Sequence, residues 1–91
     1  MGKLLYIIRD AVLLKGGPGL VVFAEAASEG VSLRVGDAVE LRQTDGSAVV
    51  TEVRAFPMVS PYDFGRRVPV SFSPEVTAQD VPVGTEVWRY P

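Results

Sequence analysis

The sequence predicts an all-β fold, a small closed or partly open antiparallel barrel of about six to seven strands. Two observations carry this prediction. Between Gly30 and Phe56, apolar and polar side chains alternate with a period of two, as in strands that bury one face. The chain of 91 residues also contains several short segments of this kind, with turn residues between them. Closing them into a barrel would remove exposed sheet edges.

The first part of the chain predicts two strands joined by a loop. Leu4–Leu14 is expected to form a long strand, bent near Arg9 and Asp10. Residues 15–19 carry glycines and a proline, so they are expected to form the loop. Leu20–Ala27 is almost entirely apolar, which predicts a second strand that is buried on both faces or covered at its edge.

Three further strands are predicted between Gly30 and Phe56. The dipeptides Gly36-Asp37 and Asp45-Gly46 mark the turns between them. The side chains expected on the apolar side are Val31, Leu33, Val35, Val39, Leu41, Val49, Thr51, Val53 and Ala55.

The turn at Asp45 and Gly46 decides which side chains share a face in this hairpin. A two-residue turn would put the charged residues of the next strand on the side of Leu41, against the alternation. We therefore predict a loop with an odd number of residues, such as a turn with a G1 bulge. Four charged side chains would then be complementary neighbours on the solvent side: Glu40, Arg42, Glu52 and Arg54.

The last third of the chain is less regular. Residues 57–67 contain two prolines and are expected to be irregular. Val68–Phe72 is expected to form a short strand, at an edge or at a strand start because of its internal proline. Ser73–Asp80 predicts a brief helical turn, with a serine N-cap followed by proline. Thr85–Tyr90 is the predicted final strand.

Composition limits the chemistry of this chain, which is expected to be a single domain over residues 1–91. It has no cysteine and no histidine, which excludes disulfides, thiolate nucleophiles and the commonest acid–base group. The formal net charge of −2 argues against general affinity for nucleic-acid phosphates, and no DNA partner is expected. No apolar run approaches the roughly 20 residues of a membrane helix. We therefore expect a cytoplasmic protein without a membrane partner.

The order of these elements also matches a known pattern. An opening strand at Leu5–Leu14 leads to a glycine-rich turn at Gly16–Gly19. Glu29–Leu41 then combines a Glu-Gly turn, a Gly-Asp turn and alternating valine and leucine, and Val49–Phe56 and Val83–Trp88 supply the next and the closing strands. In this arrangement nearly the whole chain resembles the second, β-barrel domain of elongation factor Tu and the related barrels of translational GTPases.

The resemblance implies an accessory barrel that packs beside a nucleotide-binding domain and helps to hold aminoacyl-tRNA, ribosomal or other RNA surfaces. The chain departs from the family in two places. Residues 62–67, with Pro69 after them, stand where the family often has an Ala-Gly-Asp-like segment. The phosphate-binding loop of the GTPase domain is absent from the sequence. The resemblance therefore implies the fold, and no RNA-contacting residue is carried over from it.

Catalysis and metal binding are not expected. Asp37 with Glu40, or Asp63 with Asp80, are the remaining carboxylate pairs, but no nucleophile with its base accompanies them. Asp37 and Asp45 lie in turns, where aspartate bonds the local backbone. No clustered acidic loop indicates a calcium site, and no cofactor is expected.

The candidate binding residues are Met58, Tyr62, Phe64, Arg66, Arg67 and Trp88. The first five belong to an irregular loop that sets apolar side chains beside arginines, as binding surfaces do. In the alternative that we favour, the apolar ones close a barrel end and the arginines are solvated. Trp88 and Tyr90 would stack RNA bases if they lay exposed near the arginines. For Trp88, however, we favour a place in the core.

Together these observations predict non-catalytic binding of a protein or ribonucleoprotein partner. The alternative is an RNA-binding module, for tRNA or ribosome-associated RNA, that uses Arg66, Arg67, Trp88 and Tyr90. A third class, a small-molecule or enzymatic role inside the barrel, would require a polar cavity there.

Overall fold

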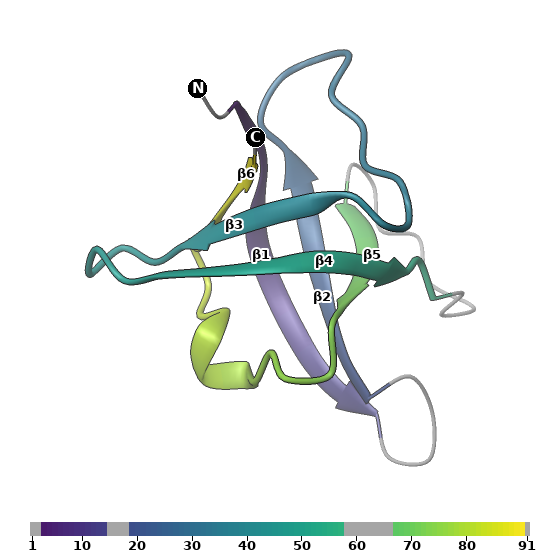
Figure 1. Cartoon of the computed structure of the whole chain (residues 1–91), viewed down its shortest axis with the longest axis vertical. Coiled ribbons are helices and arrows are strands. Elements are labelled where there is room, and N and C mark those ends of the chain that lie inside the picture. The colour runs from purple at the N-terminus through teal and green to yellow at the C-terminus, as the bar shows by residue number, and fades with distance from the viewer. Residues whose placement is uncertain (1–2, 15–18, 58–66, 91) are drawn as a thin grey trace.

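In the part of the chain that the structure describes, six antiparallel strands form a closed ring in which the first and the last strand are neighbours. The computed structural model describes residues 3–14, 19–57 and 67–90. Around the barrel the strands follow the order β1-β2-β5-β4-β3-β6 (Figure 1). The elements are β1 (Leu4–Leu14), β2 (Gly19–Ala26), β3 (Ala38–Arg42), β4 (Ala48–Ala55), β5 (Arg67–Phe72), the short 3-10 helix η1 (Ala78–Asp80) and β6 (Glu86–Arg89). The predicted all-β antiparallel barrel is confirmed.

The inside of the ring is filled by valine, leucine and isoleucine from every strand. The buried cluster consists of Leu5, Tyr6, Ile8, Val22, Ala24, Val39, Leu41, Val53, Val70, Phe72, Val76, Val81 and Val87. Complete burial of one large apolar side chain contributes about 1.5–3 kcal/mol. One inward side chain of β4 is polar: among the described residues, the hydroxyl of Thr51 is buried without a hydrogen-bond partner.

β1 and β2 extend past the rest of the barrel as a two-stranded ribbon (Figure 1). β1 has the predicted bounds and the predicted bend, because its register with β2 shifts between Ile8 and Asp10. At the bend the Asp10 carboxylate accepts a hydrogen bond from the Ala11 amide at 2.8 Å. The described pairing of β6 with β1 ends at Ile7, and that of β5 with β2 begins at Val22. Beyond these points the described part of the ribbon has no third strand.

The segment between β2 and β3 is not a strand, so the first of the three strands predicted between Gly30 and Phe56 is wrong. The chain crosses one end of the barrel here, between glycines with positive φ at positions 30 and 36. Val31 and Leu33 pack against the core, whereas Val35 is 63% exposed. The alternation thus reflects packing over the barrel end, because the closed ring leaves no strand edge for this segment.

The β3–β4 hairpin has the predicted odd loop. Val39 lies opposite Thr51, which keeps both inward side chains on the core face. The amide of Gln43 bonds the Ser47 carbonyl at 2.8 Å, and the Gly46 amide bonds the Gln43 carbonyl at 3.1 Å. The loop therefore has three residues, and its last residue, Gly46, adopts φ 95°. This is the geometry of a turn followed by a G1 bulge.

The charges of this hairpin lie on its outer side, but the prediction of their partners is wrong. Glu40 bonds Arg42 of its own strand, and the residue opposite Glu40 across the hairpin is Val50. Glu52 lies opposite Ala38. The observed register sets these charges beside small or apolar side chains, so they do not form cross-strand pairs.

β5 begins at Arg67, one residue earlier than predicted, and carries its proline at the third position. Pro69 lies opposite Phe23 of β2, while the pairing with β4 covers only Ser71 and Phe72 among the described residues. Pro69 therefore precedes the part of β5 that has neighbours on both sides, where a missing amide would remove a ladder bond. Since Arg67 and Val68 precede Pro69 within β5, the structure supports the alternative in which the proline lies at an edge, where the described pairing is with β2 alone.

The helical turn starts later than predicted. Ser73 begins a β-turn, in which its carbonyl accepts the Val76 amide at 3.0 Å. The N-cap of η1 is Thr77, whose amide donates to the Asp80 carboxylate at 2.8 Å. The end at Asp80 is as predicted. Within the described residues no helix has the length and apolar character needed to cross a membrane.

Candidate binding surface

Trp88 lies on the outer side of the barrel. Val87 is fully buried, and because side chains of a strand alternate, its neighbours Glu86 and Trp88 point outward and are half-buried. The favoured placement of Trp88 in the core is therefore wrong. The inside of the ring is already filled by aliphatic side chains, and the indole is instead covered by its neighbours on the outer surface.

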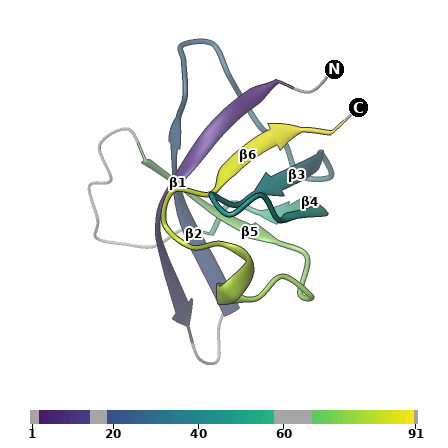
Figure 2. The same cartoon turned by 90° about the vertical axis from the view of Figure 1, so that its left-hand side faces the viewer.

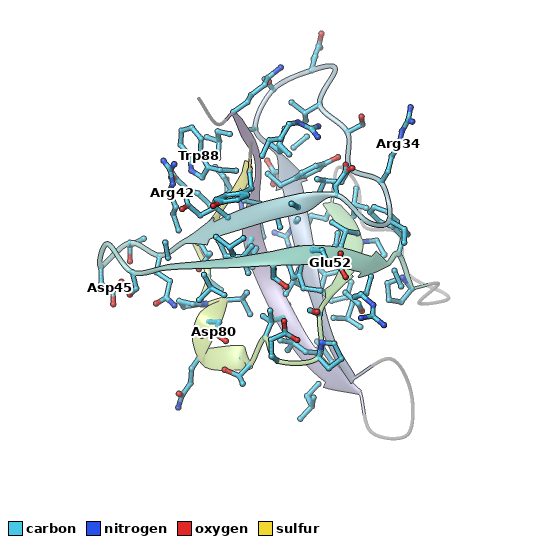
Figure 3. The ribbon with its side chains drawn as sticks, viewed as in Figure 1. Arg34, Arg42, Asp45, Glu52, Asp80 and Trp88 are labelled. Atoms are coloured by element: carbon cyan, nitrogen blue, oxygen red, sulfur yellow. The ribbon has the colours of Figure 1, made fainter. Side chains whose placement is uncertain are left out.

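Four side chains of β3 and β6, which we call the Trp88 platform, form a continuous network on this outer side: Glu40, Arg42, Glu86 and Trp88. In the strand register Glu40 lies opposite Trp88, and Arg42 lies opposite Glu86. The central carbon of the Arg42 guanidinium is 4.2 Å from the centre of the Trp88 ring, and its Nε donates to Glu40. The indole Nε1 donates to Glu86 at 2.9 Å. Figure 3 shows Arg42 beside Trp88 at one side of the barrel.

Exposed apolar and aromatic side chains flank the Trp88 platform. Val50 of β4, opposite Glu40, is 49% exposed, and Tyr90, just after β6, is 45% exposed. The platform itself holds two carboxylates and one guanidinium, so one carboxylate is in excess. The surface thus combines an aromatic centre, an apolar border and a local negative charge.

The structure describes two of the predicted site residues, Arg67 and Trp88, and these two lie apart. Arg67 begins β5, is exposed and lies opposite Glu25 of β2. In the ring order two strands separate β5 from β6 in either direction, so Arg67 and Trp88 lie on opposite sides of the barrel. The other predicted residues lie outside the described residues: Met58, Tyr62, Phe64 and Arg66.

Sequence reasoning missed the partners of Trp88, namely Glu40, Arg42 and Glu86. The spacing of Glu40 with Arg42 and of Glu86 with Trp88, two residues apart in each strand, indicated which side chains share a face. The pairing of β3 with β6 was the missing information, because these strands are far apart in the sequence.

A groove lies where the β1–β2 ribbon leaves the barrel. This groove has a volume of about 440 Å³ and is lined by Leu13, Gly19, Leu20, Phe72, Ser73, Pro74, Val76, Thr77 and Ala78. Its described lining carries no charged side chain, and two hydroxyl groups are its polar side-chain atoms. It therefore offers few groups to orient a specific ligand.

The resolved pKa shifts within the described residues do not prepare a group for acid–base chemistry near neutrality. Burial raises the pKa of the Tyr6 phenol, and hydrogen bonds from Ser47 lower the pKa of Asp45. Both shifts lead away from neutral pH. No group of three or more acidic, histidine or cysteine side chains in the described part of the chain is placed to hold a metal ion.

Comparisons of the chain with protein-family models, with curated proteins and with solved structures return no match.

Proposed function

We propose that this chain is a non-catalytic, cytoplasmic binding module that holds a protein partner on the Trp88 platform. The class expected from the sequence, an accessory barrel of the translation-factor type, suits this role because such barrels hold partners beside a catalytic domain. The observation that carries the proposal is the half-exposed indole of Trp88, stacked with Arg42 on the outer face of a closed sheet.

The side chains of this surface are of the types that contribute most to protein–protein binding. Tryptophan and tyrosine are enriched among the residues that dominate the energetics of such interfaces, and Trp88 and Tyr90 lie here in β6 and in the residue after it. The bond of Trp88 to Glu86 holds the indole in place before a partner arrives. Side chains that are already ordered lose less conformational entropy on binding.

The local charge favours a protein over an RNA partner. Glu40 and Glu86 lie in direct contact with Arg42 and Trp88, respectively, and their carboxylates would face the phosphates of any bound strand. Arg42 already shares its charge with Glu40. Arg67, the described arginine of the predicted RNA-binding set, lies across the barrel. RNA binding is therefore the alternative that the capture experiment below distinguishes from protein binding.

The test is affinity capture from the native lysate with two matched variants. Val50→Arg places a bulky cation beside the Trp88 platform, and Leu13→Arg makes the same kind of change at the groove, where Leu13 is 69% exposed. Both sites are exposed, so both variants are expected to fold. We expect wild type and Leu13→Arg to capture the same protein after nuclease treatment, and Val50→Arg to lose it.

Two results would overturn the proposal. Loss of the partner with Leu13→Arg but not with Val50→Arg would locate binding at the groove. Partners that disappear on nuclease treatment, together with a salt-dependent mobility shift on adding tRNA or single-stranded RNA, would identify an RNA-binding module. In that case Val50→Arg would strengthen the shift, because it adds a positive charge.

A further inference from the structure

We infer that the partner presents an arginine side chain to the Trp88 platform, and that Arg42 occupies the same position in the free protein. The inference rests on the proposed function and names the group that the surface recognises. In the free protein the position is filled from within, by a guanidinium that stacks on Trp88 and bonds Glu40.

The contacts of Arg42 show which ligand chemistry the position accepts. A planar guanidinium stacks on the indole face and at the same time donates to a carboxylate, a combination that the point charge of lysine does not reproduce. Here the ring centre lies 4.2 Å from the guanidinium carbon, and Glu40 supplies the carboxylate. Two groups of the Trp88 platform thus already form a guanidinium site.

Glu86 provides capacity for a second cation. It lies opposite Arg42 in the register, yet its described bond is to the indole Nε1 at 2.9 Å. A carboxylate has about four acceptor positions, so Glu86 can hold the indole and still accept from an incoming donor. With two carboxylates and one resident arginine, the electrostatics of the platform favour an added positive charge.

Arg42 is displaceable. Its side chain is 45% exposed, and an ion pair at such an exposed site contributes at most about 1 kcal/mol. An arginine from a partner therefore competes with Arg42 for the indole and for Glu40. Because the position is occupied in the free protein, the apparent affinity for the partner is reduced by the fraction of molecules in which the position is open. Removal of Arg42 should then strengthen binding.

The experiment uses Trp88 itself as the probe, since it is the single tryptophan of the chain. The fluorescence of the protein is followed while a short peptide is added that has one central arginine and is otherwise uncharged. The same peptide with citrulline, which keeps the shape and loses the charge, and with lysine, which keeps the charge and loses the plane, are the matched ligands. We expect saturable binding of the arginine peptide, weaker binding of the lysine peptide and none of the citrulline peptide.

Three variants test the role of Arg42. Arg42→Gln is expected to bind the arginine peptide about threefold to tenfold more tightly, because the internal competitor is gone. Glu40→Gln removes the negative charge of the acceptor and is expected to weaken binding by a similar factor. Arg54→Gln, on the exposed outer side of β4, removes the same charge at a residue outside the Trp88 platform and should leave affinity within about twofold of wild type. Circular dichroism verifies that each variant is folded.

Equal binding of the arginine and citrulline peptides would overturn the inference, and so would an Arg42→Gln variant that binds no more tightly than wild type. Should Arg42→Gln fail to fold, the Glu40→Gln variant decides: unchanged affinity there would also overturn it. These outcomes are separate from the capture experiment. If Val50→Arg loses a captured protein while arginine peptides do not bind, the proposed function stands and the arginine inference fails.

Discussion

Two arginine–glutamate pairs on the barrel surface differ in what lies beside them. On one half of the ring, Arg42 bonds Glu40 and also stacks on Trp88. On the other half, Arg9 of β1 lies 3.5 Å from Glu25 of β2, and this ion pair is its described contact. An exposed pair by itself contributes little, because water and salt screen it and two long side chains must be ordered. The comparison indicates that an aromatic ring beneath a charge pair turns a common surface feature into a position with defined geometry.

Removal of the Trp88 indole should abolish the difference between the two pairs, and it should have the largest effect on stability. Trp88→Ala loses a half-buried indole and its contact with Arg42, so we expect the free energy of unfolding to fall by about 2 kcal/mol. Urea denaturation measures it. Tyr90→Ala, just beyond β6, is the control and should change stability by less than about 0.5 kcal/mol. Equal effects of the two variants would show that the indole gives the Trp88 platform no structural support.

A second test concerns the inner face of β4, the strand that pairs with β3 of the Trp88 platform. Thr51→Val replaces a buried hydroxyl that has no partner among the described residues, so it should raise the free energy of unfolding by about 1 kcal/mol. The matched control is Thr85, also buried, whose hydroxyl donates to the Pro82 carbonyl at 2.6 Å. Thr85→Val should lower stability by about 1 kcal/mol. Thermal or urea unfolding compares the two, and a shared sign would contradict the contrast.

Double-mutant cycles measure the coupling energy of each arginine–glutamate pair directly. We expect a coupling energy of about 1 kcal/mol between Arg42 and Glu40, where stacking on Trp88 restricts the guanidinium, against about 0.3 kcal/mol between Arg9 and Glu25. Both couplings should shrink in 1 M salt, and that of the exposed Arg9–Glu25 pair should vanish. Coupling energies that do not differ would mean that the ring adds nothing to the pair.

The smallest effect is expected in the loop of the β3–β4 hairpin. The amide and hydroxyl of Ser47 bond the Asp45 carboxylate and hold the pKa of Asp45 below its ordinary value. A lowered pKa in the folded state stabilises the fold above the ordinary pKa, and this contribution disappears as the pH falls through the lowered value. Ser47→Ala removes one donor and should raise the pKa of Asp45 toward the ordinary value, as followed by NMR titration of the carboxyl carbon. An unchanged pKa would contradict the assigned bonds.

Local structure was predictable where neighbouring residues decide it. The bend of β1 at Arg9 and Asp10, the three-residue loop ending at Gly46 and the inward side of β4 all follow from alternation and turn chemistry. The same rules failed for Val31–Val35, because alternation there reports packing over the barrel end and a strand also needs a partner edge.

The candidate site depended on information that the sequence does not carry locally. The sequence indicates Trp88 as a candidate, but its outward position is set by Val87, whose side chain lies inside the ring. Arg42 and Glu40 reach it because β3 pairs with β6, and the same ring order moves Arg67 to the opposite side. Pairing between distant strands is settled by the closure of the whole barrel, which no single segment encodes.

The pairing of β1 with β6 has a consequence for how the molecule comes into being. Leu4 lies opposite Trp88, and the Arg89 amide bonds the Lys3 carbonyl at 2.8 Å, so the two described ends of the chain run side by side (Figure 2). During synthesis β1 must wait until β6 has emerged from the ribosome before the ring can close. Contacts between such distant segments make folding slow, and β1 would expose its edge meanwhile. The Trp88 platform contains two residues of β6, so it forms only after β6 has been synthesised.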